Sequence, residues 1–276
     1  MASARVAVVG HTEWVEFARV RAVPRPGQIV HASETFAVPA GGGPVAAVQL
    51  AKLAGRAAFF TALGDDELGH RTEAGLRDLG LDVHAAFRPE AQRRAFTYLD
   101  DAGERTITVI GERLGPRGDD PLPWDDLADC DAVYFTAGDP GSLARARAAR
   151  VLTATTRAMP VLVEAGIALD AVIGSARDRD ERYVPVEPPP AAVLLTEGAA
   201  GGSWTTAGGR SGRWAAAPLP GPVRDAYGCG DSFSGGVTYG LGAGPSLEEA
   251  LALGARCGAA CLTGRGPYEA QLTAPG

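Results

Sequence analysis

The sequence predicts an α/β fold in which a doubly wound, mostly parallel β-sheet is flanked by helices and carries a small β-sheet lid. Two observations predict it. Short β-branched or apolar runs alternate with longer amphipathic segments along most of the chain, as they do when helices cover a parallel sheet. Two stretches, at about 13–43 and 94–110, break this alternation. We expect residues 1–276 to form one domain, with the lid strands in those two stretches.

The elements follow from the same periodicity. Main-sheet strands are predicted where short apolar runs are bounded by turn residues: Arg5–Val9, Ala57–Leu63, Ala132–Ala137, Pro160–Glu164, Ala171–Ile173 and Ala192–Thr196. Helices are predicted where apolar residues recur every three to four positions: Pro44–Ala54, Asp66–Leu79, Ser142–Ala158, Gly228–Gly240 and Leu247–Thr263.

The lid is predicted from an extended segment and a hairpin. Gln28–Pro39 has an extended pattern, and within Arg94–Ile110 the runs RAFTYLD and RTITVI flank the turn DAGE. Together these segments predict a small sheet separate from the main one. Two interpretations of it stay open: a flap that shields a site at the carboxyl ends of the parallel strands, or surface strands with no gating role.

Composition narrows the class of partner. The formal net charge is −7 and no basic block occurs, so nucleic acid is not expected as a partner. No apolar run has membrane-spanning length, and the opening MASARVAVVG lacks the regions of a signal peptide. The four cysteines form no C-x-x-C pair and predict buried thiols rather than a zinc site. We expect a cytoplasmic protein, without membrane contact, that binds a small molecule.

The scarcity of lysine excludes several enzyme classes. Lys52 is the single lysine among 26 basic residues, and it lies within a helical pattern. A P-loop nucleotidase, a protein kinase and a Schiff-base enzyme therefore lack their key residue unless Lys52 supplies it. The stretch VVGHTEWV after the first strand also lacks G-x-G-x-x-G, which argues against a nicotinamide-dependent Rossmann enzyme.

The most informative segment is DAYGCGDSFSGG, residues 225–236, a glycine-bounded turn that enters a helix. The first turn of a helix presents unpaired N–H groups and the positive end of its dipole. Gly228, Cys229 and Gly230 let the main chain approach an anion closely, which predicts a phosphate cradle without lysine. Asp231 follows directly and is placed to accept a proton from an attacking hydroxyl. The alternative is that Asp231 only caps the helix.

This segment resembles the D-T-x-G-A-G-D-x-F-x-G-G signature of the ribokinase-like, or PfkB carbohydrate kinase, family. Other stretches match in the family's order: VVGHTEWVEFARVRAVPRPGQIV, AGGGPVAAVQLAKLAG, FFTALGDDELG, DDAGERTI, VLLTEGAAGG and GARCGAACLTGRGP. The resemblance covers nearly the whole chain and implies a ribokinase-like fold. It further implies an ATP-dependent phosphotransferase that uses Mg²⁺ and acts on an alcohol group.

The resemblance also implies roles for individual residues. Asp231 would be the base, Gly228 to Gly230 the anion hole, and Asp225 an organiser of the metal and phosphates. Cys229 replaces the usual alanine and is interpreted as a tolerated small residue. The other expected nucleotide contacts are Thr196, Gly198 and Gly201 beside the ATP phosphates, and Cys257 and Gly258 near the adenine. The alternatives are a strand end with its turn for the first three, and a helix face packed on the sheet for the last two.

The acceptor side departs from the family pattern. Where members carry an Asp that grips sugar hydroxyls, this chain has Val15, flanked by Glu13 and Glu16, either of which is a candidate replacement. The glycines Gly41, Gly42 and Gly43 are candidate acceptor contacts, but the expected Asn is absent. Glu13 is interpreted either as a substrate ligand or as a solvated loop residue. The acceptor is therefore open: a sugar or sugar derivative, a nucleoside, or none if the protein is a catalytically silent binder.

The family's N-x-x-E metal element is reduced here to Ser175–Asp178, with Glu181 nearby. Asp178 and Glu181 are the candidate metal residues, and an exposed charged helix is the alternative. The resemblance also suggests a homodimer formed through the lid strands.

Overall fold

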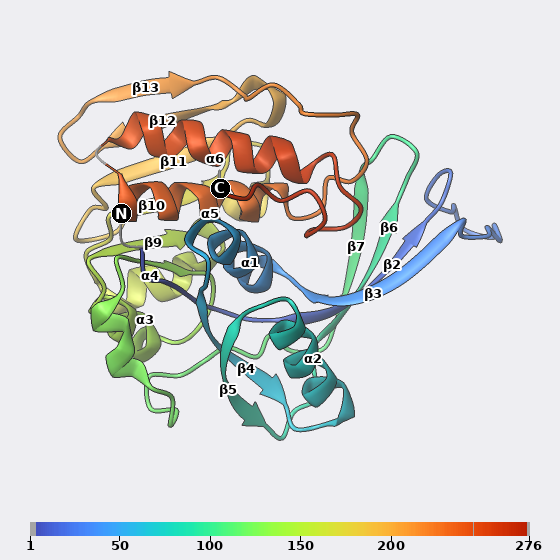
Figure 1. Cartoon of the computed structure of the whole chain (residues 1–276), viewed down its shortest axis with the longest axis horizontal. Coiled ribbons are helices and arrows are strands. Elements are labelled where there is room, and N and C mark those ends of the chain that lie inside the picture. Colours follow the sequence, from blue (N-terminus) through green and yellow to red (C-terminus); the bar gives the residue numbers. More distant parts are fainter. Residues whose placement is uncertain (1–3, 245, 275–276) are drawn as a thin grey trace.

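The computed structural model describes residues 4–244 and 246–274, and its centre is a nine-stranded sheet (Figure 1). The strand order is β13-β12-β11-β10-β9-β8-β1-β4-β5, in which β11 through β5 run parallel and β12 pairs antiparallel with both β11 and β13. The strands are β1 Val6–Val9, β4 Ala58–Gly64, β5 Asp82–Arg88, β8 Ala132–Phe135, β9 Val151–Thr155, β10 Ala171–Ser175, β11 Ala192–Thr196, β12 Gly202–Thr206 and β13 Ser211–Trp214.

Helices cover both faces of this sheet, which confirms the predicted fold class (Figure 1). They are α1 Gly42–Ala54, α2 Glu67–Asp78, α3 Pro140–Ala146, α4 Met159–Ala165, α5 Cys229–Ala243 and α6 Leu247–Cys261. Alternate residues of β1 face opposite layers: Val6 and Val8 join the core beneath α1, α5 and α6, whereas Ala7 and Val9 join the core beneath α3 and α4. Within the described residues, no helix has both the length and the apolarity needed to cross a membrane.

A second, four-stranded sheet projects from the main body and confirms the predicted small sheet (Figure 1). Its strands are β2 Glu13–Arg19, β3 Glu34–Ala40, β6 Arg94–Leu99 and β7 Arg105–Ile110, in the order β3-β2-β6-β7. We call this sheet the lid. Phe17 of the lid packs edge-on against Tyr227, with ring centroids 5.0 Å apart, so the lid is anchored beside the start of α5.

Two predicted elements are wrong, and both lie between β8 and β10. The segment Ser142–Ala158 is not one helix: α3 ends at Ala146, and VLTAT forms β9. The alanines and arginines before it favour a helix, but the β-branched run pairs with β8 and β10, and this tertiary pairing overrides local propensity. Pro160–Glu164 is not a strand but part of α4, which has Pro160 in its first turn and is followed by a C-cap, Gly166, in the left-handed conformation.

Other differences concern elements that the periodicity did not reveal. The strands β5, β12 and β13 lie outside every predicted range, because each is an edge or near-edge strand whose buried positions are few. In the predicted extended segment, residues 28–33 form no strand, and β3 begins only at Glu34.

Candidate active site

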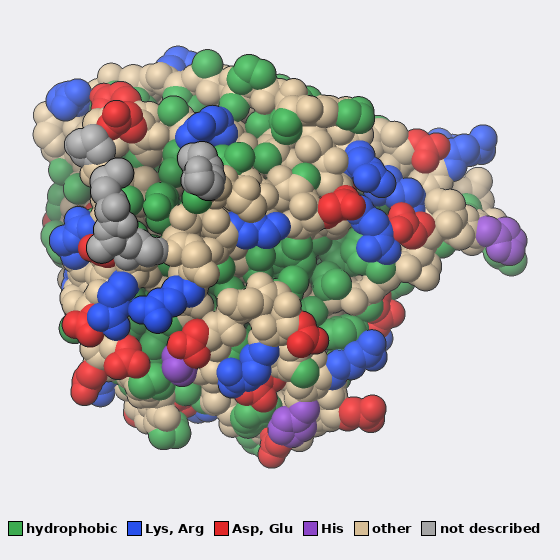
Figure 2. Space-filling model, in the orientation of Figure 1, with side chains coloured by type: hydrophobic (Ala, Val, Ile, Leu, Met, Phe, Trp, Pro, Cys, Tyr) green, Lys and Arg blue, Asp and Glu red, His purple; other side chains and the backbone are tan. Residues whose placement is uncertain are grey.

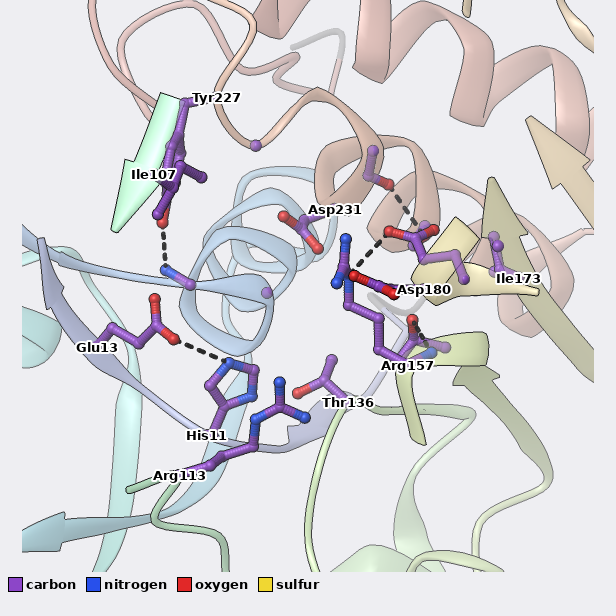
Figure 3. A pocket seen from close by; sticks show the side chains of 18 of the residues that line it. His11, Glu13, Ile107, Arg113, Thr136, Arg157, Ile173, Asp180, Tyr227 and Asp231 are labelled. Carbon is purple, nitrogen blue, oxygen red and sulfur yellow. Dashed lines mark hydrogen bonds and ion pairs between the residues drawn. The ribbon is translucent and has the colours of Figure 1, made fainter. Parts of the chain in front are cut away.

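A cavity of about 440 Å³ lies where the carboxyl ends of the central strands meet the lid (Figure 3). Its floor comes from residues at or just after strand ends: His11, Thr136, Thr155, Gly174 and Thr196. Ile107 and Val109 of β7 form part of its wall, so the lid borders the cavity. Parallel α/β sheets place ligand sites at this edge, because loops from neighbouring strands converge there.

The mouth of α5 opens onto this cavity. Gly228 is the N-cap in a left-handed conformation (φ 79°), and no side chain caps the helix, so the first-turn N–H groups are free to bind an anion. A Cβ atom on Gly228 would lie 2.8 Å from Val45, whereas one on Gly230 would meet nothing within 4 Å. Gly228 and Gly230 line the cavity, and Cys229 between them does not. The helix start thus opens onto the cavity without a side-chain cap, and its role as a phosphate cradle stays a prediction.

Asp231, the predicted base, lies in the first turn of α5 and lines the cavity (Figure 3). A Cβ atom on Gly42 would lie 3.0 Å from Oδ1 of Asp231, so the carboxylate is packed against the start of α1. Burial, reinforced by the charge of Glu181, raises the pKa of Asp231 to about 6. A carboxyl group with this pKa is largely ionised at neutral pH and is a stronger base than an exposed aspartate.

Two buried side chains hold the loop that leads to this mouth. The Asp225 carboxylate accepts hydrogen bonds from the backbone N–H groups of Tyr227 (2.8 Å) and Gly266 (3.0 Å). The Tyr227 hydroxyl accepts one from the N–H of Gly41 at 3.2 Å, which joins the α5 loop to the α1 loop. Asp225 does not line the cavity, and burial raises its pKa. The structure shows it as a loop anchor, and a role in organising metal and phosphates stays a prediction.

On the opposite side of the cavity, Glu13 is held by basic residues. Its Oε1 accepts a hydrogen bond from Nε of Arg93 at 2.7 Å and lies 3.8 Å from Nε2 of His11. Because only 9% of the Glu13 side chain is exposed, the interpretation as a solvated loop residue is wrong. Glu16 instead pairs with Arg94 outside the cavity lining. Glu13 is thus the predicted acceptor residue that the structure brings into the cavity.

Burial, followed by the positive charges of Arg113 and Arg93, holds the pKa of His11 well below its usual range. The imidazole is therefore neutral at physiological pH. Burial and the charge of Arg93 also lower the pKa of Arg113. Figure 3 shows Arg113 beside His11 and Thr136, all on the side of the cavity away from α5.

The glycines that open α1 divide between the cavity and the core. Gly41 and Gly42 line the cavity, as expected for acceptor contacts. Gly43 does not, and a Cβ atom there would lie 2.6 Å from the carbonyl oxygen of His11 and 2.9 Å from Phe59. Gly43 therefore serves the close packing of α1 on the sheet.

The two predicted metal residues are joined by an arginine. Arg157 donates to Asp178 (2.5 Å) and to Glu181 (2.9 Å). Glu181 and its neighbour Asp180 line the cavity, but Asp178 does not. In the parts of the chain that the structure describes, no group of three or more His, Cys, Asp or Glu residues could hold a metal ion. Any metal here would need additional ligands from a bound molecule.

The residues expected beside the nucleotide are also divided. Thr196 lines the cavity, whereas Gly198 and Gly201 lie in the following turn outside the lining. Cys257 is fully buried against Gly236 of α5, and Gly258 packs beside the Cys229 carbonyl. The α6 pair therefore shows the helix-packing arrangement, and its contact with adenine stays a prediction.

Several cavity residues escaped the sequence reasoning, among them His11, Arg93, Arg105, Arg113, Thr136 and Arg157. His11 and Thr136 had a usable signal, because each is a polar residue at the carboxyl end of a predicted parallel strand. The arginines had no such signal in the sequence, since 26 basic residues are spread over the chain and only the fold shows which of them face the cavity.

Comparisons with known proteins identify the family of the chain. The family model described as pfkB family carbohydrate kinase matches residues 3–186 and 169–274. A fructokinase of Vibrio alginolyticus is 30% identical over 115 residues, a match that covers 40% of this chain and only 35% of the fructokinase.

Solved structures share the fold at low sequence identity. A putative ribokinase of Agrobacterium tumefaciens superposes with a TM-score of 0.79 at 21% identity, over 98% of this chain and 94% of its own. A ribokinase of Arabidopsis thaliana, solved with ribose and ATP, gives a TM-score of 0.75 at 19% identity, over 98% and 96% of the two chains. The family match extends over nearly the whole sequence and includes the glycine turn at the mouth of α5. The chain belongs to the pfkB family of carbohydrate kinases.

Proposed function

We propose that the protein is an ATP-dependent kinase that phosphorylates a hydroxyl group of a small metabolite, a sugar or sugar derivative. Family membership supports the reaction class, and the fructokinase match supports a sugar-like acceptor. The Arabidopsis ribokinase bound to ribose and ATP supports ATP as the donor. The observation that carries the proposal is the position of Asp231, in the cavity and in the first turn of an uncapped helix mouth.

In this reaction, Asp231 accepts the proton of the acceptor hydroxyl as the oxygen attacks the γ-phosphorus of ATP. A new O–P bond forms, the bond from the γ-phosphorus to the bridging oxygen breaks, and ADP leaves with the electron pair. The N–H groups at the mouth of α5, around Gly228 and Gly230, stabilise the negative charge on the transferring phosphoryl group. Arg157 and Arg105, which also line the cavity, add positive charge near Asp231.

The donor set fits a magnesium ion that is bound mainly by the nucleotide. Mg²⁺ in kinases is held by one or two carboxylates together with substrate phosphates, rather than by a protein cage. Glu181 and Asp180 line the cavity and would supply those carboxylates. When bound, the ion would neutralise charge on the phosphates. Asp178 is turned toward Arg157 and would act only by holding that arginine.

A nucleoside acceptor and a silent binding protein are the competing functions. The absence of Asn from the glycine-rich start of α1 weakens a standard sugar site. The elevated pKa of Asp231 at the cavity is what a working base needs, and this favours an enzyme over a silent binder. A screen of acceptors that monitors ADP release decides between the three.

The direct test is Asp231→Asn. We expect turnover to fall by about 10²–10⁴-fold, because the general base is lost while the cradle amides remain. ATP affinity, measured by calorimetry, should be retained within a few fold. Asp101→Asn is the matched control, since Asp101 lies exposed in the lid turn. Full activity in Asp231→Asn would refute the assignment of the base.

We also propose that the lid mediates a homodimer. Ile29 is 91% exposed, and Val30 and Ile110 are 40% and 47% exposed. Figure 2 shows hydrophobic side chains in the hollow where the lid leaves the main body. β3 and β7 are unpaired edge strands, which favour self-association. Ile110→Asp should shift the sedimentation coefficient to that of a monomer, whereas Val163→Asp on α4 should not. A monomeric unmodified protein would refute this.

A further inference from the structure

Two of the four cysteines come together where α5 begins and α6 ends. Cys229 is the first residue of α5, and Cys261 is the last residue of α6. The two helices pack antiparallel (Figure 1): a Cβ atom on Gly240 would lie 2.7 Å from Cα of Ala250, and one on Gly258 would lie 3.2 Å from the carbonyl oxygen of Cys229. The start of α5 therefore lies against the last turn of α6.

Both thiols lie against the loop that enters α5, and they interact with each other. Sγ of Cys261 donates to the carbonyl oxygens of Tyr227 at 3.5 Å and Pro267 at 3.6 Å. Sγ of Cys229 lies 3.8 Å from the carbonyl oxygen of Asp225. The interaction with Cys229 lowers the pKa of the Cys261 thiol, and the same interaction, together with burial, raises the pKa of the Cys229 thiol. Both cysteines are free, so the pair is a reduced dithiol.

The other two cysteines lie elsewhere. Cys257 packs against α5 two turns further along, where a Cβ atom on Gly236 would lie 2.7 Å from its Sγ. Cys130 comes just before β8, at the edge of the sheet opposite the cavity. Both are buried, and so is Cys261, whereas Cys229 is partly exposed. The pair of Cys229 and Cys261 therefore combines a neighbouring thiol with access from solvent, the two features of a cysteine pair that oxidises readily.

Cys229 lies in the part of the chain whose position the proposed reaction depends on. It stands between Gly228 and Gly230, both of which line the cavity at the mouth of α5. An S–S bond is about 2.05 Å long, much shorter than the separation of two unbonded sulfur atoms, so closing it pulls the start of α5 toward α6. Hydrogen-bond donors in such a site work only when they are held within about 0.5 Å of the productive geometry. A misplacement of about 1 Å can cost about 10²-fold in rate.

We propose that Cys229 and Cys261 form a reversible disulfide that switches off the mouth of α5 when a peroxide is present. The formation of the bond concerns only these two thiols, whereas its effect on turnover rests on the proposed kinase function. The bond gives Cys229 a role although its side chain does not line the cavity. In reducing compartments such disulfides are transient and redox-sensing rather than structural.

The chemistry needs only the two thiols and one molecule of hydrogen peroxide. The Cys261 thiolate accepts the proton of Cys229, and the Cys229 sulfur, the more exposed of the two, attacks one peroxide oxygen. The O–O bond breaks, hydroxide leaves and combines with the proton that Cys261 had released, and Cys229 becomes a sulfenic acid. The Cys261 sulfur then attacks the sulfenic sulfur: the S–S bond forms, the S–O bond breaks, and a second water leaves. The two sulfurs lose two electrons, and the peroxide oxygens gain them.

Peptide mapping of the full chain tests whether the bond forms. The reduced protein is treated with a small molar excess of hydrogen peroxide, free thiols are blocked with iodoacetamide, and trypsin digestion follows without reductant. Cleavage after arginine places Cys229 in the peptide 225–256, and Cys257 and Cys261 together in the peptide 257–265. We expect these two peptides to be linked, and dithiothreitol to separate them. No link, a bond confined to the peptide 257–265, or a link to the peptide 118–145, which contains Cys130, would overturn the proposal.

Variants identify the two sulfurs. The link should persist in Cys257→Ser, and it should be lost in Cys229→Ser and in Cys261→Ser. Thermal melting of the reduced variants shows that each is folded, and either of the last two suffices if the other is not. A link that survives in Cys261→Ser, or one that disappears in Cys257→Ser, would assign the bond to Cys257 and overturn the proposed pair.

The effect on the site is measured on the same samples. Oxidation of the unmodified protein should weaken ATP binding, measured by calorimetry, and slow ADP release by about tenfold or more, and dithiothreitol should restore both. Cys261→Ser, compared with itself before treatment, should show neither loss. Cys130→Ser is the matched control, because it removes a thiol at the opposite edge of the sheet, and it should respond to peroxide as the unmodified protein does.

The outcomes separate this switch from the proposed function. A complete link without any loss of ATP affinity, or an equal loss in Cys261→Ser, would overturn the switch. If the reduced protein released no ADP with any acceptor, the kinase function would fail, and the switch would still be decided by the peptide map and the ATP affinity. ADP release that peroxide leaves unchanged would support the kinase and overturn the switch.

Discussion

The buried carboxylate of Asp231 should destabilise the folded protein, so removing its charge should stabilise it. Burial and the charge of Glu181 raise the pKa of Asp231 from 3.8 to about 6. A shift of about two units corresponds to about 3 kcal/mol of the free energy of unfolding, at about 1.4 kcal/mol per unit. The ionised group is penalised in the native state at neutral pH. Asp231→Asn should therefore raise the free energy of unfolding by about 3 kcal/mol at pH values well above 6.

The sign and range of this effect follow from linkage. Above the folded pKa of about 6, both states carry the charge and only the native state is penalised, so the full gain is present. As the pH falls from about 6 through 3.8, the native carboxylate takes up its proton first and the advantage of Asn disappears. Urea unfolding of both proteins at about pH 8 and about pH 4 measures the difference, with Asp101→Asn as the exposed control. Equal free energies of unfolding for Asp231→Asn and the unmodified protein at about pH 8, or a difference that does not change with pH, would refute the raised pKa of Asp231.

Three further predictions concern the mouth of α5. Because Asp231 must be ionised to act as the base, and its pKa is about 6, kcat/KM should fall about tenfold per pH unit below pH 6. A flat pH profile of kcat/KM down to about pH 5, measured with a non-ionising acceptor, would contradict this prediction. Gly228→Ala should lose about 1–3 kcal/mol of unfolding free energy, because φ at this position is 79° and the new Cβ would lie 2.8 Å from Val45. Gly230→Ala should unfold with nearly unchanged free energy, because its new Cβ would meet nothing within 4 Å. Equal losses of the two variants in urea titrations would disprove the packing argument. Cys229→Ala should keep full turnover, since the side chain does not line the cavity and its interaction with Cys261, together with burial, raises the pKa of the thiol. A large drop in kcat would give the thiol a role.

The strands were predictable from the sequence where the composition of a short run of residues decides the structure. The runs at β1, β4, β8, β10 and β11 are apolar on both faces because helices cover both sides of the sheet, and that composition is visible in the sequence. The segment at β9 was not predictable, since its identity as a strand depends on pairing with β8 and β10. Its alanine-rich and arginine-rich approach favours a helix, which the structure forms only as far as Ala146.

The uncapped helix start that we propose as an anion cradle, and the carboxylate beside it, were determined by the sequence itself. A left-handed Gly228, an uncapped helix start and Asp231 in the first turn are properties of a few consecutive residues, and local backbone geometry decides them. The grouping of His11, Thr136 and Arg113 at the cavity wall was decided only by the tertiary structure. His11 and Thr136 are far apart in the chain and meet because β1 and β8 pair in parallel, and Arg113 joins them because the lid returns the chain to that edge. Long-range strand pairing selects which polar residues share a cavity, and no short stretch of sequence contains that information.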